Sequence, residues 1–454
     1  MNETMNNSIL ERIFKAYDVR GKVGEELNSE TLMSIGQAFG QWLPNKGVVA
    51  VGRDMRPDSA ELAQAIIAGL TAQGRDVWDI GEVTSDMIYF AVGHYGLAGG
   101  AMITASHNPG EYNGIKFCRE DAKPVGEESG LFEIRDAVQA NNLPTTNMLG
   151  KVQQKDLTED WITHVLSFIN IDTLLPLKIA VDAGNGMAGK IFPELEPFVP
   201  FEVKEMYFEL DGTFPNHIAN PLEPKNLVDL QKVVRDQKCD AGIAFDGDGD
   251  RAVLVDETGE VLSGTVMTAL LAQYFLAKSP GATILHNAIC GRAAVDTITS
   301  GGGKAIRTRV GHSFIKSDMR SNNAEFAGEH SGHYYFKDNF MADSGLIAAV
   351  IALHILSQSK QALSSLVAPV RKAYIQINET NFEAQNKQAV MDKISQSFTD
   401  GDQDWLDGLT INFNDSWFNV RPSNTESLLR LNAEAKTKDK LDALVAKVTN
   451  LIQE

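Results

Sequence analysis

Short apolar runs that could form strands alternate with helical patterns over most of the chain. The apolar segments 48–51 and 77–80 are typical of strands, and segment 59–73 between them has the apolar spacing of a helix. The same order starts again near 178–182 and near 282–285. The pattern predicts three α/β units of similar size, although no internal repeat is visible as sequence identity.

The pattern changes in class towards the C-terminus. Three segments with alternating apolar and polar residues predict an antiparallel sheet: 374–377, 409–413 and 428–433. The amphipathic segment 438–452 predicts a closing helix. Stretches with polar residues or proline at 141–146 and 368–372 are candidate linkers between domains.

Length and composition limit the class of protein. At 454 residues the chain is too long for one hydrophobic core and suggests three or four domains. Its 43% hydrophobic and 22% charged content is ordinary for a globular protein, and the net charge of −19 argues against a nucleic-acid partner. The N-terminus is polar, and the apolar run 345–356 is too short to span a bilayer, so it predicts a buried helix. We expect neither export nor a membrane partner.

The three cysteines indicate the compartment. Cys118, Cys239 and Cys290 are odd in number and lack the spacing of a metal site. Unpaired thiols are typical of a reducing environment, so the sequence predicts a cytoplasmic protein.

A serine with the surroundings of a phosphoryl carrier lies in the motif Thr104-Ala105-Ser106-His107-Asn108-Pro109. The apolar run 97–103 predicts a buried strand that enters a tight turn at 108–110, with the Ser106 hydroxyl at the strand end. A serine hydroxyl carries a phosphoryl group only when its proton is removed and a cation neutralises the oxygens around it. The alternative is a turn serine that hydrogen bonds to the local backbone.

Three aspartates at every second position could hold that cation. Asp246, Asp248 and Asp250 lie between the expected strands 241–245 and 252–255. A calcium-binding EF-hand is excluded because its sixth position would be Arg251 instead of glycine and its flanks would be helices. Hard oxygen ligands with coordination positions left for a phosphate favour Mg²⁺.

The segment Gly184-Asn185-Gly186-Met187-Ala188-Gly189 follows an expected strand and matches the glycine pattern of dinucleotide-binding folds. Alone, this pattern is a weak signal. Close packing between a strand and a helix needs the same glycines, and we favour that interpretation.

Four motifs occur in order and at wide spacing: 104–109, 246–251, Gly328-Glu329-His330-Ser331-Gly332-His333, and Arg421-Pro422-Ser423-Asn424-Thr425-Glu426. Together they resemble the four active-site loops of the α-D-phosphohexomutases. With the N-terminal Phe14-Lys15-Ala16-Tyr17-Asp18-Val19-Arg20-Gly21, the resemblance covers nearly the whole chain.

The resemblance implies an α/β fold of four domains around a central cleft, with three related α/β domains and a smaller C-terminal α+β domain. We expect these domains at 1–145, 146–258, 259–369 and 370–454. In that order they would carry the phosphoserine, metal-binding, sugar-binding and phosphate-binding loops.

The resemblance also implies roles for the loop residues. Ser106, as phosphoserine, would give its phosphoryl group to a hexose phosphate and take the other phosphate back from a hexose 1,6-bisphosphate, which also serves as activator. Mg²⁺ would be held by Ser106, Asp246, Asp248 and Asp250. The other expected catalytic residues are His107, Lys116, Arg251 and Arg20, although a structural hydrogen bond is an alternative role for His107. The expected substrate-binding residues are Tyr17, His312, Glu329, Ser331, His333, Arg421, Ser423, Asn424 and Thr425.

The resemblance implies a hexose phosphate as the substrate, and the third loop indicates which hexose phosphate it is. Gly-Glu-His-Ser-Gly-His is closest to the Gly-Glu-Met-Ser-Gly-His form of phosphomannomutases, with His330 in place of methionine. We therefore expect a phosphomannomutase, either a monomer or a small homo-oligomer. Phosphoglucomutase and phosphoglucosamine mutase activities are alternatives.

Two rival classes can be weighed. A serine hydrolase would need a Gly-x-Ser-x-Gly elbow, which the chain lacks, and it would leave the aspartates without a role. A non-catalytic sugar-phosphate-binding protein would keep the Arg421 loop while losing Ser106 or an aspartate, and all of these residues are present.

Overall fold

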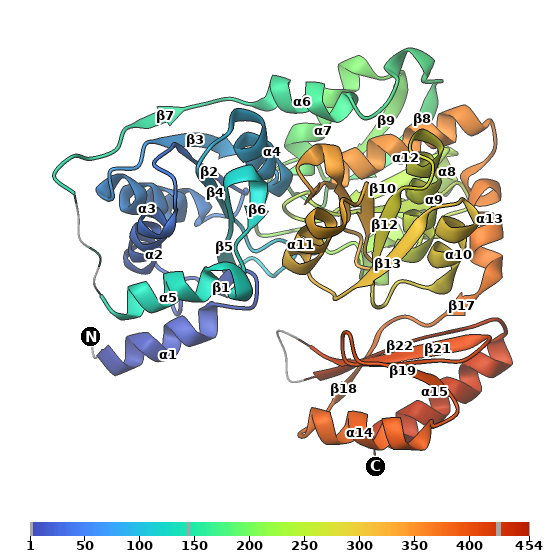
Figure 1. Ribbon diagram of the computed structural model, residues 1–454. Coiled ribbons are helices and arrows are strands. Elements are labelled where there is room, and N and C mark those ends of the chain that lie inside the picture. The colour runs from blue at the N-terminus through green and yellow to red at the C-terminus, as the bar shows by residue number, and fades with distance from the viewer. Residues whose placement is uncertain (1–2, 142, 144–145, 424–427, 454) are drawn as a thin grey trace. The chain divides into compact units, whose positions relative to one another are not determined.

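The computed structural model describes residues 3–141, 143, 146–423 and 428–453 (Figure 1). The chain divides into two compact units, Met1–Leu262 with Ser331–Ser364, and Ser263–His330 with Ser365–Glu454. Within the described ranges, no single helix is long and apolar enough to cross a membrane. Two consecutive helices reach the length and apolar composition of a membrane span only when they are taken together, Gly345–Ser359 and Leu363–Ala373. The chain bends by 107° at the break between them.

The first sheet of the first unit has the order β1-β5-β4-β2-β3-β7, with β6 paired to β5. Strands β2, β3 and β4 are parallel, and β5 runs antiparallel to β4. Its strands are β1 (Val19–Lys22), β2 (Val49–Arg53), β3 (Val77–Glu82), β4 (Gly99–Ile103), β5 (Tyr112–Arg119), β6 (Lys123–Pro124) and β7 (Val152–Gln154). Its helices are α1 (Glu3–Ile13), α2 (Ser29–Trp42), α3 (Ser59–Ala72), α4 (Ser85–Tyr95) and α5 (Leu131–Gln139). The expected strand–helix–strand order from 48 to 80 is confirmed.

The second sheet of this unit has the order β11-β10-β8-β9, and its strands are β8 (Leu177–Asp182), β9 (Phe201–Met206), β10 (Ala241–Phe245) and β11 (Ala252–Asp256). Strand β10 is parallel to β8 and antiparallel to β11. The turn that joins β10 to β11 contains the three aspartates. The unit also contains α6 (Thr158–Leu166), α7 (Ala188–Leu195), α8 (Val228–Gln237), the buried helix α12 (Gly345–Ser359) and the hairpin of β15 (Tyr334–Phe336) and β16 (Ala342–Asp343).

The second unit contains parallel strands in the order β13-β12-β14 and a C-terminal antiparallel sheet. The first set comprises β12 (Thr283–Asn287), β13 (Lys304–Thr308) and β14 (Phe326–Gly328) with α9 (Gly264–Lys278), α10 (Arg292–Ser300) and α11 (His312–Asn322). The C-terminal sheet comprises β17 (Ile375–Gln376), β18 (Thr380–Glu383), β19 (Asp402–Asp404), β20 (Leu409–Asn412), β21 (Ser416–Pro422) and β22 (Leu428–Ala435), with α14 (Lys387–Ser397) and α15 (Lys438–Gln453). The antiparallel sheet and closing helix expected from the sequence are confirmed.

Short 3₁₀ turns complete the chain: η1 (Glu120–Ala122), η2 (Glu127–Ser129), η3 (Ile171–Thr173), η4 (Glu196–Phe198), η5 (Pro224–Leu227) and η6 (Lys337–Asn339).

The segment 368–372, a candidate linker in the sequence, is helical instead. It lies in α13 (Leu363–Ala373), which contains Pro369. Proline removes one hydrogen bond from a helix, but burial of an apolar face can offset that cost. Here Leu363 and Val367 are almost fully buried.

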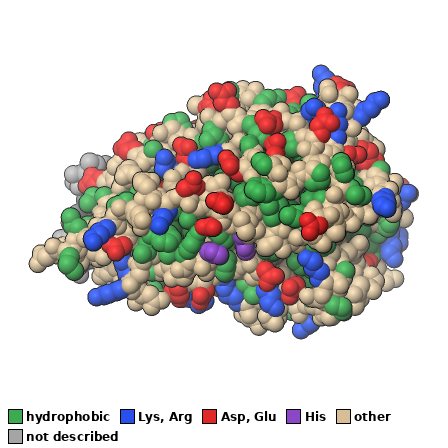
Figure 2. Space-filling model, turned by 90° about the horizontal axis from the view of Figure 1, so that it is seen from above, with side chains coloured by type: hydrophobic (Ala, Val, Ile, Leu, Met, Phe, Trp, Pro, Cys, Tyr) green, Lys and Arg blue, Asp and Glu red, His purple; other side chains and the backbone are tan. Residues whose placement is uncertain are grey.

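Acidic and basic side chains are interspersed on the face shown in Figure 2. The chain has 60 acidic and 41 basic residues, and side chains of both signs lie near one another on this face. Such a mixed surface disfavours non-specific attraction to polyanions.

The glycine-rich segment at 184–189 is explained by close backbone packing. A Cβ on Gly186 would lie 2.8 Å from the Gly247 carbonyl oxygen, and a Cβ on Gly189 would lie 2.2 Å from the Phe208 carbonyl oxygen. The Met187 amide donates to the Gly247 carbonyl at 2.9 Å. Gly186 lets the loop before α7 contact the aspartate turn, and Gly189 lets the start of α7 contact the segment after β9, as the packing interpretation requires.

Helices α2 and α3 cross at two glycines. A Cβ on Gly69 would lie 2.2 Å from the Met33 carbonyl oxygen, and a Cβ on Gly36 would lie 2.5 Å from the Ile66 carbonyl oxygen. The backbones approach too closely at this crossing for any side chain.

We expect Gly69→Ala to destabilise the protein by about 1–2 kcal/mol. Overpacking costs ~1–3 kcal/mol, which the better helix propensity of alanine offsets by up to ~1 kcal/mol. Thermal unfolding measures the difference, with Ala68→Ser on the exposed side of the same helix as the control. A stability gain in Gly69→Ala would show that the helices can separate without cost.

The loop after β9 is held by a partly buried ion pair. His217 Nε2 lies 3.1 Å from Asp182 Oδ2, and His217 Nδ1 lies 3.0 Å from the Ile218 carbonyl oxygen. Both ring nitrogens therefore face acceptors, which suits the doubly protonated ring. Burial opposes its charge, but the bond to Asp182 outweighs burial and raises the pKa of His217 above its usual 6.5.

The raised pKa of His217 means that the folded state binds this proton more tightly than the unfolded state does. We therefore expect the pair to stabilise the fold below pH ~6.5 and to lose this effect as pH rises through the raised pKa of His217. His217→Gln should lower the urea midpoint more at pH 5.5 than at pH 8.5. When Asp182→Asn is already present, His217→Gln should lower the urea midpoint by the same amount at both pH values. Equal losses at both pH values would contradict the prediction.

Candidate active site

Ser106 is directed at the aspartate turn. It follows β4, is almost fully buried and has a positive φ of 51°, which is uncommon outside glycine. Its hydroxyl donates to Asp246 Oδ2 at 2.8 Å and lies 3.1 Å from His107 Nδ1. The structure thus brings together the first two motifs that the sequence singled out, 140 residues apart.

The three aspartates form a compact set of oxygen ligands. Asp246, Asp248 and Asp250 are buried and each offers a carboxylate oxygen within 4.8 Å of the others. Lys116, on β5, donates to Asp248 Oδ2 and to Asp250 Oδ2, both at 2.6 Å. A Cβ on Gly247 would lie 2.4 Å from the Ser106 carbonyl oxygen, so glycine is required where the two loops meet.

The carboxylates interact strongly because they are buried together. Burial and the charges of Asp250 and Asp248 raise the pKa of Asp246 well above its usual range. Burial opposes ionisation of Asp250, but Lys116 and His333 hold its pKa well below the usual range. Burial disfavours the ammonium of Lys116, but Asp248 and Asp250 outweigh it and raise its pKa. The cluster therefore has more negative charge than Lys116 alone balances.

These residues fit a divalent cation. Asp248 Oδ1 is buried and accepts no hydrogen bond from the described residues, so it is available to a metal ion. Three carboxylates are hard oxygen ligands of the kind that Mg²⁺ prefers, and a divalent charge would allow all of them to ionise.

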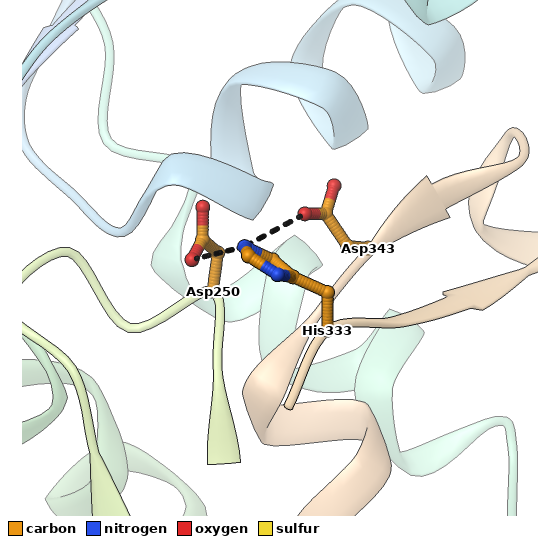
Figure 3. Close-up of side chains that lie close together, drawn as sticks. All are labelled: Asp250, His333 and Asp343. Carbon is orange, nitrogen blue, oxygen red and sulfur yellow. Dashed lines mark ion pairs between the residues drawn. The ribbon is translucent and has the colours of Figure 1, made fainter. Parts of the chain in front are cut away.

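His333 is positioned between two carboxylates (Figure 3). Its Nε2 lies 3.4 Å from Asp250 Oδ1 and 3.9 Å from Asp343 Oδ2. Arg251 Nε donates to His333 Nε2 at 3.2 Å and lies 3.4 Å from Asp246 Oδ2. These contacts connect the third motif to the aspartate turn within the first unit.

Arg20 connects the N-terminal motif to the serine turn. It lies on β1, and its guanidinium donates to Asn108 Oδ1 at 2.7 Å and to Asp18 Oδ2 at 2.5 Å. Tyr17 is half-buried in the turn before β1. His107 is half-buried. Loss of solvent around its ring, aided by the charges of Arg251 and Arg20, lowers its pKa well below the usual range.

Other expected substrate-binding residues belong to different units. Ser331 belongs to the first unit, and its hydroxyl lies 3.2 Å from His333 Nδ1. In the second unit, Glu329 follows β14, is buried and accepts from Asn287 Nδ2 at 3.1 Å. The neighbouring His330 has its pKa lowered by burial. His312 begins α11 and is half-buried.

Arg421 and Ser423 of the fourth motif lie at the end of β21 in the second unit. Arg421 is buried and donates to Glu379 Oε2 at 3.3 Å, and Arg430 donates to the other oxygen at 3.0 Å. The Ser423 amide donates to the Leu428 carbonyl at 2.8 Å. Asn424 and Thr425 lie outside the described residues.

Sequence reasoning missed several groups that contact the site residues. Ser85 begins α4 and donates to Asp248 Oδ2 at 2.5 Å, while its amide donates to the Asp248 carbonyl at 3.0 Å. The run Thr84-Ser85-Asp86 before an apolar segment is a helix-start signal that could have placed it there. Asp343 and Glu379 are single acidic residues with no motif around them, so their sequence contains no such signal.

All four domain models of one family match the chain. They are phosphoglucomutase/phosphomannomutase alpha/beta/alpha domains I, II and III, at residues 11–144, 159–259 and 263–374, and the C-terminal domain at 379–451. The chain belongs to the phosphoglucomutase/phosphomannomutase family, and its fold has three α/β domains and a C-terminal domain.

Named relatives cover nearly the whole chain. A protein described as phosphohexose mutases from Xanthomonas campestris is 40% identical over 97% of this chain and 99% of its own length. A phosphomannomutase from Vibrio cholerae is 37% identical over 97% and 98%, respectively. The solved structure of a family protein from Burkholderia thailandensis has a TM-score of 0.90 at 30% identity and covers 98% of this chain and 97% of its own.

We expect Asp248→Asn to weaken Mg²⁺ binding at least about tenfold, because it removes a charged oxygen ligand. Isothermal titration of the folded protein with Mg²⁺ measures the change. Asp229→Asn, in the same unit but hydrogen bonded to Tyr207, is the control and should bind as the wild type does. Unchanged affinity in a folded Asp248→Asn protein would contradict a metal site at this turn.

Proposed function

We propose that the protein is a phosphomannomutase that interconverts mannose 1-phosphate and mannose 6-phosphate through a phosphorylated Ser106. One observation carries the proposal: the Ser106 hydroxyl lies 2.8 Å from Asp246 Oδ2, in a buried set of three carboxylates that fits a divalent cation. Relatives named phosphomannomutase or phosphohexose mutases, at 37–40% identity, support the class of substrate.

Phosphoryl transfer needs in-line positioning and charge neutralisation more than covalent assistance from the protein. Mg²⁺ bound by Asp246, Asp248, Asp250 and an oxygen of phosphorylated Ser106 would neutralise the transferring group. Phosphoserine donates its phosphoryl group to the free hydroxyl of the hexose phosphate. The other phosphate of the resulting hexose 1,6-bisphosphate then returns to Ser106.

The cationic side chains around Ser106 would steady the phosphoryl oxygens. Arg20 contacts Asn108 of the serine turn, while Arg251 and Lys116 contact the aspartates. His333 has carboxylates on both sides and would exchange a proton with a sugar hydroxyl. His107 orients the Ser106 hydroxyl through its Nδ1.

The proposed substrate-binding residues are those that the family resemblance implies. Tyr17, His312, Glu329, Ser331 and His333 would contact the sugar. Arg421 and Ser423, with Asn424 and Thr425, would bind the phosphate that is not transferred, because a guanidinium fork with hydroxyl and amide donors suits phosphate.

The four domain ranges expected from the sequence stay predictions.

A broader activity is the second candidate. The relative from Xanthomonas campestris is described as phosphohexose mutases, which supports glucose phosphates as further substrates. Mannose and glucose differ at one hydroxyl, whose recognition could rest on one hydrogen bond worth ~1 kcal/mol. Phosphoglucosamine mutase activity stays an alternative.

The cellular setting is proposed from composition. Cys118, Cys239 and Cys290 are buried and none of the three is in a disulfide bond, which supports a cytoplasmic location. The net charge of −19 supports the absence of a nucleic-acid partner. We also propose that the protein is a monomer or a small homo-oligomer and that it has no membrane partner.

The deciding experiment compares conversion of mannose 1-phosphate and glucose 1-phosphate to their 6-phosphates, with Mg²⁺ and a trace of hexose 1,6-bisphosphate. We expect turnover that a chelator abolishes, faster for mannose. Ser106→Ala should lose at least about 1,000-fold in kcat, because it removes the phosphoryl carrier, while still binding the sugar phosphate. The control is Ser167→Ala, an exposed serine whose hydroxyl donates to the His164 carbonyl.

No turnover of either sugar would direct the assay to glucosamine 1-phosphate. If that substrate also fails, the protein is a sugar-phosphate binder and the catalytic proposal is wrong.

A further inference from the structure

Arg56 is a fully buried cation behind the serine turn. It lies between β2 and α3, and its side chain has 0% exposure to solvent. A buried charge is expensive unless every polar group has a partner, so the partners of Arg56 indicate what it is for.

All five N–H groups of the Arg56 guanidinium are used. Nε donates to Asp54 Oδ2 at 3.2 Å. The other four bonds reach backbone carbonyls of one turn: Nη1 donates to Pro109 at 2.8 Å and Tyr112 at 2.9 Å, and Nη2 donates to Ser106 at 2.8 Å and Asn108 at 2.6 Å. One side chain thus holds the turn 106–112 at four points.

The turn also has bonds of its own, since the Asn108 amide donates to the Ala105 carbonyl and the Tyr112 amide donates to the Pro109 carbonyl, both at 3.0 Å. Of the side chains that bond to it, Arg56 is the one that reaches four of its carbonyls. Ser106 has left-handed backbone angles, which cost of order 1–3 kcal/mol outside glycine and persist only when the surroundings enforce them. The Ser106 carbonyl is enclosed between Arg56 Nη2 and Gly247, where a Cβ would lie only 2.4 Å away. The carbonyl and the side chain of Ser106 leave the same Cα, so bonds that fix the carbonyl also fix where the Cα–Cβ bond points and restrict where the hydroxyl can reach.

The guanidinium is itself fixed from two sides. Asp54 accepts from the Arg56 amide at 3.1 Å and from Ser59 Oγ at 2.5 Å, so its carboxylate cannot turn away. The Phe214 ring lies against the guanidinium, with its centroid 5.2 Å from Cζ. The donor fork is therefore held in place before any substrate binds.

We propose that Arg56 is a positioning residue for phosphoryl transfer, which holds the turn 106–112 so that the Ser106 hydroxyl is aligned with the aspartate turn. This inference rests on the proposed role of Ser106. Lysine cannot replace arginine here, because a compact ammonium with three donors does not span four carbonyls as a planar fork does. Arg56 does not touch the substrate, so it governs kcat and leaves substrate affinity unchanged.

The test is Arg56→Lys in the full-length protein. A displacement of about 1 Å at a reacting group can cost ~100-fold in rate. We expect kcat to fall about 100-fold while KM for mannose 1-phosphate stays within about threefold. Phosphorylation of Ser106 by hexose 1,6-bisphosphate should slow by the same factor. In that step the sugar P–O bond breaks, a bond to Ser106 Oγ forms and the sugar oxygen takes the proton. Quenched-flow mixing followed by mass spectrometry of the intact protein measures the rate of this phosphorylation.

The matched control is Arg75→Lys. Arg75 is also a buried arginine of the first unit that holds a loop by its carbonyls, with bonds to Gly40 at 2.8 Å, to Leu43 at 2.7 Å and to Asn45. Its loop is outside the site. Arg75→Lys should lower the melting temperature as much as Arg56→Lys does and leave kcat unchanged.

A folded Arg56→Lys protein with kcat within threefold of the wild type would overturn the inference, as would equal kcat losses in the two lysine variants. If Arg56→Lys does not fold, Phe214→Leu decides, because loss of the ring face should lower kcat about three- to tenfold at constant KM. An unchanged kcat in Phe214→Leu would then overturn it. A wild-type protein inactive on all three sugar phosphates would overturn the proposed function and this inference together, whereas an active wild type with an equally active Arg56→Lys would overturn the inference alone.

Discussion

The burial of three carboxylates in one turn is the constraint on which the rest of the first unit depends. Asp246, Asp248 and Asp250 cannot all ionise in a dry environment unless cations and hydrogen-bond donors surround them. Strand β5 supplies Lys116, the helix start of α4 supplies Ser85, and the segment before β15 supplies His333. Elements from distant parts of the chain are therefore required to meet at this turn.

Close approach of the backbones follows from the same constraint. Gly247 leaves room for the Ser106 carbonyl, and Gly186 leaves room for the Gly247 carbonyl, so three loops contact one another without side chains between them. The serine turn is then held from behind by Arg56 and in front by the aspartates. A hydroxyl in such rigid surroundings is suited to phosphoryl transfer, which depends on alignment more than on chemical activation.

The fourth motif shows a similar compensation of charge, with the sign reversed. Arg421 and Arg430 face each other across β21 and β22, where like charges repel. Glu379 accepts from both, and burial opposes its ionisation while Arg421 and Asn432 hold its pKa below the usual range. The two guanidinium groups outnumber the one carboxylate, so a net positive charge lies beside the residues proposed to bind phosphate.

The sequence by itself determined the α/β units, the antiparallel C-terminal sheet, the grouping of three aspartates that could hold a metal ion, and the turn at Ser106. These features depend on local periodicity and on the chemistry of short motifs, which are complete within a few residues. It misjudged 368–372, because burial of α13 overrides the local preference of Pro369. Only the tertiary structure decided that Ser85 and Asp343 contact the site residues, that Lys116 bonds to Asp248 and Asp250, and that Arg56 holds the serine turn. Such contacts join residues up to 163 positions apart, and a single charged or polar residue contains no local signal of the partner it will meet.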